Sequence, residues 1–231
     1  MHRTEKLESA GSDFAPLRMT LRDGRSATIR EIRPDDADAF QTALERLSAD
    51  TLHSRFFSSI RPTPAMIERA VRTDAERDRA LVAVTGEAAT PTIAGGGRCI
   101  SAEDRESGEF AVMVADEWRG AGLASGIMKA LIQDARARGL KRMEGYVLAE
   151  NRSMLDLARR LGFAVGASEE GPAVKLVSLD LGSTASNSAI TTYRSLPPAR
   201  RASNGQQVIS VRRVPPSLRV TQVSRLSSTS S

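Results

Sequence analysis

The segment DEWRGAGLASGIMKALIQDARARG, residues 116–139, places three glycines within seven positions and then continues with the pattern of an amphipathic helix. Glycine inside a helix costs about 1 kcal/mol relative to alanine. Gly120, Gly122 and Gly126 therefore need a reason to stand where a helix should begin. Apolar residues then recur at four-residue spacing, which predicts a helix that packs one face on a sheet and ends at Gly139.

These glycines are suited to a helix start that binds an anion. The first turn of a helix leaves backbone N–H groups without partners, and the helix dipole adds positive potential, so a phosphate is favoured there. Glycines also let a phosphate approach the backbone of residues 119–124 closely. A P-loop needs Gly-Lys-Ser/Thr and a Rossmann turn needs G-x-G-x-x-G, and neither spacing is present. The alternative is that the glycines only form a tight turn.

The order of the remaining segments predicts one α/β domain with a mixed sheet. Strand patterns alternate with amphipathic patterns that carry helix start and stop signals. The predicted strands cover residues 26–32, 79–86, 92–101, 108–116, 141–148, 163–167 and 173–181. The predicted helices cover residues 33–48 and 63–73, the part of 116–139 that follows the glycine turn and includes Leu123, and residues 151–162.

Composition limits the class of protein and its compartment. The 231 residues contain one cysteine, Cys99, and two histidines, so no internal disulfide and no Cys/His zinc site can form, and we expect no metal. No apolar run approaches the length of a membrane span, and the N-terminus lacks a secretory pattern. We therefore expect a cytoplasmic protein that does not enter a membrane.

The basic charge is concentrated at the C-terminal end. Residues 183–231 hold seven arginines and no Asp, Glu or Lys, whereas residues 1–182 carry a net charge of −2. We expect residues 1–15 and the basic low-complexity tail 183–231 to be disordered, with the folded domain between them at 16–182. The tail predicts at most weak binding to nucleic acid.

Arg119-x-x-Gly122-x-Ala124 resembles the Arg/Gln-x-x-Gly-x-Gly/Ala motif of the GNAT acetyltransferase superfamily, and the resemblance covers about residues 26–181. More narrowly, RFFSS (55–59), GEFAVMVADEWRGAGL (108–123) and LAENRSMLDLARRLGF (148–163) are similar to the bacterial protein-lysine acetyltransferase branch. The resemblance implies a mixed, mostly antiparallel central sheet flanked by about four helices. It also implies an acetyl-CoA-dependent transfer to a primary amine, most simply a protein lysine.

The resemblance assigns the cofactor to specific positions. The backbone of the strand before the glycines would pair with the pantetheine arm, the amides that follow would hold the diphosphate, and an Asn would contact the arm. The residues implied are Val112, Met113, Val114, Arg119, Gly120, Ala121, Gly122, Leu123, Ala124, Ser125 and Asn151. Asn151 also stands where a helix N-cap is preferred, and the two roles are compatible.

Glu109 is the candidate general base. A lysine amine with a pKa near 10.4 is mostly protonated at neutral pH, so a group must accept its proton. Strand alternation places Glu109, Ala111 and Met113 on one face, and the lysine-acetyltransferase branch uses a Glu on this strand. The alternative is a solvated carboxylate at the end of a strand.

The sequence departs from many family members at Ala158, where they carry a Tyr that protonates the leaving thiolate. Either the thiolate leaves unassisted or another group, such as Tyr146, donates the proton. The departure leaves two other functions open: a catalytically weak acyl-CoA-binding regulatory protein, and an acetyltransferase of a small-molecule amine. Acyl-CoA synthetases are candidate protein acceptors, and the chain is expected to be a monomer or a homodimer.

Overall fold

The computed structural model describes residues 14–48, 63–74, 76–86 and 91–182. Their strands form one eight-stranded sheet in the order β1-β2-β3-β4-β5-β6-β8-β7, in which β5–β6 is the parallel pair and the other neighbours are antiparallel. The strands are β1 Leu17–Thr20, β2 Ser26–Glu31, β3 Asp78–Thr85, β4 Thr92–Ser101, β5 Ser107–Val114, β6 Arg142–Leu148, β7 Ala164–Ala167 and β8 Val174–Asp180. The α-helices are α1 Ala37–Glu45, α3 Pro64–Val71, α4 Leu123–Ala137 and α5 Arg152–Arg160.

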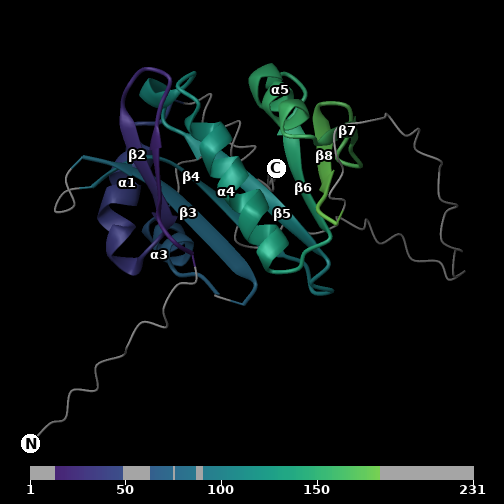
Figure 1. The fold of residues 1–231 in the computed structure, drawn as a ribbon, viewed down its shortest axis with the longest axis horizontal. Helices are drawn as coiled ribbons and strands as arrows, with labels where there is room; N and C mark the ends of the chain where they lie inside the picture. The colour runs from purple at the N-terminus through teal and green to yellow at the C-terminus, as the bar shows by residue number, and fades with distance from the viewer. Residues whose placement is uncertain (1–13, 49–62, 75, 87–90, 183–231) are drawn as a thin grey trace, which may run out of the picture.

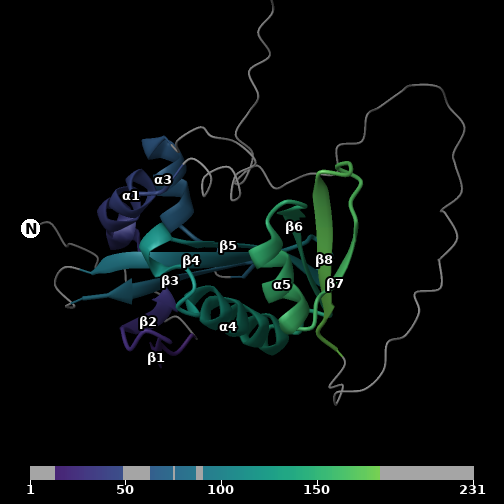
Figure 2. The same cartoon turned by 90° about the horizontal axis from the view of Figure 1, so that it is seen from above.

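Helices cover both faces of the sheet (Figures 1 and 2). Helix α4 lies on one face and buries Ile127 and Leu131 completely against the central strands. Helices α1 and α3 lie on the opposite face, where Leu44 and Ile67 pack against Met113 of β5. The predicted α/β class, with a mixed, mostly antiparallel sheet and four helices in the described part of the chain, is therefore confirmed.

Strand β1 was not predicted from the sequence. It has four residues, of which Leu17, Arg18 and Thr20 are exposed, so it lacks the buried alternating face that marks a strand in sequence. It pairs with β2 from Leu17↔Ile29 to Thr20↔Ser26. The expectations of disorder for residues 1–13 and 183–231 fall outside the described residues.

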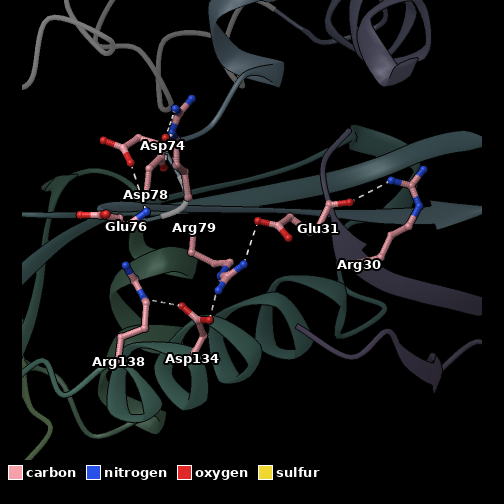
Figure 3. Close-up of polar contacts among 9 residues, drawn as sticks. Arg30, Glu31, Asp74, Glu76, Asp78, Arg79, Asp134 and Arg138 are labelled. Carbon is pink, nitrogen blue, oxygen red and sulfur yellow. Dashed lines mark hydrogen bonds and ion pairs between the residues drawn. The ribbon is translucent and has the colours of Figure 1, made fainter. Parts of the chain in front are cut away.

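A buried charge network ties helix α4 to the sheet (Figure 3). Asp134 of α4 accepts a hydrogen bond from Nε of Arg79 in β3 at 2.8 Å and another from Nε of Arg138 at 2.8 Å. Arg79 also donates from Nη1 to Glu31 of β2 at 2.7 Å. Because Arg79 and Asp134 are both buried, their charges depend on each other for compensation.

Two further buried groups near this network have shifted pKa values. Burial raises the pKa of Asp78 above its usual value, although hydrogen bonds from Arg98 oppose the shift. Burial also raises the pKa of the Cys99 thiol to about 11, so this thiol stays protonated at neutral pH. The single cysteine of the chain is therefore a packing residue.

Replacing Asp134 by Ala should lower the free energy of unfolding by about 3–5 kcal/mol, because two guanidinium groups lose their buried carboxylate. Urea denaturation measures the change. The matched control is Glu76→Gln, which removes the exposed ion pair with Arg105 at 2.8 Å and should cost at most about 1 kcal/mol. Equal losses in the two variants would contradict an anchoring role for Asp134.

Candidate functional site

The sheet opens between β5 and β6. Their parallel pairing ends at Glu109↔Glu144, and residues 110–114 continue in register with β4 alone. The Phe110 ring lies over Gly145 at this point, where an added Cβ would approach ring atom Cε1 to 2.8 Å. Phe110 also packs edge-to-face on Phe163, with ring centroids 5.2 Å apart. An aromatic ring thus fills the space next to β6 where the two strands separate.

A cavity of about 630 Å³ lies in this opening. It runs along β5 to the start of α4 and is closed on the other side by the end of β6 and by α5. Its lining consists of residues 110–114, 118–120, 122–125, 146, 147, 150, 151, 153, 154, 157 and 160, together with Arg22.

Two of the three glycines have backbone conformations that only glycine adopts readily. Gly120 has φ +73°, and Gly122, the N-cap of α4, has φ +94°. The first hydrogen bond of the helix runs from Gly126 N–H to Gly122 O at 3.1 Å, so the amides of Leu123, Ala124 and Ser125 precede it. These three residues line the cavity. The predicted helix start is therefore present, and it faces the opening.

Gly126 serves packing. A Cβ at Gly126 would lie 2.6 Å from Met19 Sδ and 3.4 Å from Ile29 Cδ1, so its absence lets the β1–β2 hairpin lie directly on α4. Glycine at this helix start is therefore explained by backbone conformation at Gly120 and Gly122 and by close packing at Gly126.

The loop before α4 is held by charged contacts. The side chain of Arg119 pairs with Asp116 at 2.8 Å. The guanidinium carbon of Arg25 lies 3.7 Å from the centroid of the Trp118 ring, and its Nη2 donates to Glu117 O at 3.0 Å. Ala121 is buried and is not among the cavity-lining residues, whereas Gly120 and Gly122 on either side of it are.

Asn151 caps helix α5 at the cavity wall. Its Oδ1 accepts hydrogen bonds from Met154 N–H at 3.2 Å and from Ser153 Oγ at 3.0 Å. The predicted N-cap is confirmed, and the half-buried side chain also lines the cavity. Its amide nitrogen takes no part in these capping bonds.

Glu109 is the last residue of β5 that pairs with β6; it is half-buried and does not itself line the cavity. Tyr146 of β6 does line it. Burial, followed by the negative charge of Glu109, raises the pKa of the Tyr146 hydroxyl, so the phenol keeps its proton at neutral pH. Ala158 is completely buried, so α5 presents no acid at that position.

Sequence reasoning missed two cationic residues of the cavity, Arg22 and Arg160. Arg22 lies between β1 and β2, about a hundred residues from the glycine motif, and no sequence pattern connects the two segments. Arg160 had a detectable signal, since it follows Ser153 and Leu157 at helical spacing along the face of α5 that lines the cavity.

Comparisons with known proteins agree with this architecture. Residues 27–164 match the family model described as acetyltransferase (GNAT) domain. Acetyltransferase PA5475 of Pseudomonas aeruginosa is 34% identical over 145 residues, which are 62% of this chain and 78% of that protein. Acetyltransferase Pat of Mycolicibacterium smegmatis is 30% identical over 149 residues, which are 64% of this chain and 44% of Pat, so this chain spans less than half of Pat.

The GNAT domain of S. lividans PAT superimposes with a TM-score of 0.66 at 25% identity, covering 71% of this chain and 96% of that domain. The fold and the matches define the class of protein as an acetyltransferase. The chain belongs to the GNAT acetyltransferase family.

Two kinds of feature are absent from the described residues. None of the described helices combines the length and the apolar character that a membrane span requires. Within the same residues, no three His, Cys, Asp or Glu side chains are placed to hold a metal ion.

Asn151→Ala should lower the free energy of unfolding by about 0.5–2 kcal/mol, because the Met154 N–H loses its capping acceptor. Asn151→Asp keeps an acceptor at the N-cap and should retain nearly all of the stability. Thermal or urea unfolding of the two variants measures the difference. Equal destabilisation by Ala and Asp would show that the cap does not stabilise α5.

Proposed function

We propose that this chain transfers the acetyl group of acetyl-CoA to a primary amine, with a protein lysine as the acceptor and Glu109 as the general base. The observation that carries the proposal is the continuity of one cavity, which runs from the unpaired edge of β5 to the bare amides at the start of α4. The two parts suit the two halves of coenzyme A, an amide-bearing arm and a diphosphate.

Each half of the cofactor has a matching backbone surface. Residues Val112 to Val114 pair with β4 on one side only, so their other edge can accept the pantetheine amides as an added strand. The amides of Leu123, Ala124 and Ser125 and the dipole of the 15-residue helix α4 favour the diphosphate. Gly120 and Gly122 would let the phosphates come close, and Asn151, which lines the same cavity, would contact the arm.

The acceptor amine would approach from the face of the sheet that carries α1 and α3. Met113 packs toward these helices, and by alternation Ala111 and Glu109 share its face of β5. Glu109 therefore stands beside the point where the strands separate, on the face opposite α4. There it would take a proton from the acceptor's ammonium group, directly or through water, so that the neutral amine can attack the thioester carbonyl and displace the CoA thiolate.

The leaving thiolate has two routes in this cavity. A thiol with a pKa near 8.5 can leave without an acid. Tyr146, which lines the cavity and keeps its proton, is the phenol placed to assist among the described residues. Neither route needs an acidic side chain at position 158, where this chain has a buried alanine.

The assignment of a protein lysine rests on the similarity to the proteins named Pat and PAT. Acyl-CoA synthetases are the first acceptors to test, and the single, reduced cysteine fits a cytoplasmic reaction. A small-molecule amine is the second candidate acceptor. A regulatory protein that binds acyl-CoA without turnover is the alternative to catalysis.

Glu109→Gln should reduce kcat at least about 100-fold, because the amine loses its proton acceptor, while the KM for acetyl-CoA stays unchanged. The release of CoA, followed with a thiol reagent, measures the rate. Glu144→Gln is the matched control, since Glu144 is the register partner of Glu109 on the neighbouring strand. Equal rates for Glu109→Gln and the wild type would exclude Glu109 as the base.

A folded acyl-CoA synthetase incubated with the enzyme and acetyl-CoA should be acetylated on lysine, at a higher kcat/KM than free lysine or a polyamine. Mass spectrometry of the acceptor identifies the modified residues. The buried Cys99 will not disturb a thiol assay of CoA release. Faster turnover of a small amine would replace the protein acceptor in this proposal, and tight acetyl-CoA binding with no turnover on any amine would favour the regulatory alternative.

A further inference from the structure

The β1–β2 hairpin lies on the loop that leads into α4. The N–H of Arg22 donates to Ala121 O at 3.0 Å, which joins the hairpin turn to the glycine segment. Arg25 adds the hydrogen bond to Glu117 O and the stacking on Trp118 described above. Met19 packs against Gly126 one turn into the helix. The hairpin is therefore fixed over the mouth of the cavity by several independent contacts.

These contacts place the side chain of Arg22 above the N-cap of α4. An added Cβ at Gly122 would lie 3.8 Å from both Cγ and Nε of Arg22, and Arg22 lines the cavity beside Gly122 and Leu123. Arg25 and Arg119 in the same region each pair with an aspartate. In the described part of the chain, the Arg22 guanidinium has no such partner.

The exposed Arg22 guanidinium lies at the end of α4 where the helix dipole does not favour a cation. The N-terminal end of α4 carries the positive end of the helix dipole, and cations are stabilised at the opposite end. An anion held between Arg22 and the helix amides would be attracted both by the Arg22 guanidinium and by the positive end of the α4 dipole. A phosphate also fits the planar, two-pronged donor geometry of arginine.

We propose that Arg22 binds a phosphate of the nucleotide end of acetyl-CoA, acting as a side-chain clamp opposite the backbone amides of α4. The inference rests on the proposed function of the cavity and adds to it a cation that comes from a distant hairpin. Arg22 is a binding residue in this proposal and takes no part in the acetyl transfer itself.

The test compares Arg22→Gln with Arg18→Gln. Arg18 is an exposed arginine of the same hairpin that does not line the cavity. Calorimetry measures the Kd of each full-length variant for CoA, for 3′-dephospho-CoA and for pantetheine, which carries no phosphate. Arg22→Gln should weaken CoA binding about tenfold, the loss expected for one charge-assisted contact. It should also flatten the dependence of Kd on salt, while Arg18→Gln matches the wild type.

The three ligands identify which phosphate is bound. A loss for both CoA and dephospho-CoA, with pantetheine unaffected, assigns Arg22 to the diphosphate. A loss for CoA alone assigns it to the 3′-phosphate. Equal losses for all three ligands would indicate a structural role and overturn the proposal, as would equal affinities of Arg22→Gln and Arg18→Gln for CoA. A wild-type chain that binds no CoA would overturn the proposed function as well, whereas CoA binding that is independent of Arg22 overturns this inference alone.

Discussion

The separation of β5 from β6 is the constraint on which the site depends. Pairing stops after Glu109↔Glu144, where the Phe110 ring takes the space above Gly145. A continuous parallel pair would satisfy the edge of β5 with backbone bonds and leave no room for a ligand. Because the strands separate, residues 110–114 keep one edge open, and the cavity extends from that edge to the start of α4. One aromatic–glycine contact thus marks the beginning of both the cavity and the available strand edge.

The position of α4 determines where an anion can be held. Near its C-terminal end, Asp134 binds Arg79 of the sheet and Arg138 of the following turn. Along its length, Gly97 lets β4 approach, since a Cβ there would come within 2.7 Å of Ile127 and 2.8 Å of Leu131. A helix held in this way cannot shift without breaking buried ion pairs and core contacts. Its N-terminal amides are therefore part of a rigid element, which suits a binding site that must be preformed.

The sequence predicted the elements whose signals are local. The glycines, the amphipathic face of α4 and the Asn151 cap each depend on neighbouring residues, so their patterns can be recognised in the sequence. The order of such patterns along the chain then predicted the α/β fold class. Strand β1 was missed because a short, exposed strand has no hydrophobic period. The position of Arg22 depends on how the hairpin packs on α4, which no local pattern encodes. Likewise, alternation along β5 predicted the face of Glu109, but only the strand register placed it beside the opening.

Arginines line the cavity, and several carboxylates lie near its Tyr146 side. Arg22, Arg119 and Arg160 line it, and the first two flank the start of α4. Near Tyr146, burial is the largest cause of the raised pKa of the phenol, and the negative charges of Glu109, Glu144, Glu170 and Glu169 add to it. The same negative charges would favour the ammonium form of an approaching amine, whereas burial would oppose it. An amine that arrives as ammonium cannot attack a thioester, so the proposed transfer needs a base next to the opening. In the proposed mechanism, Glu109 both adds to these negative charges and accepts the proton.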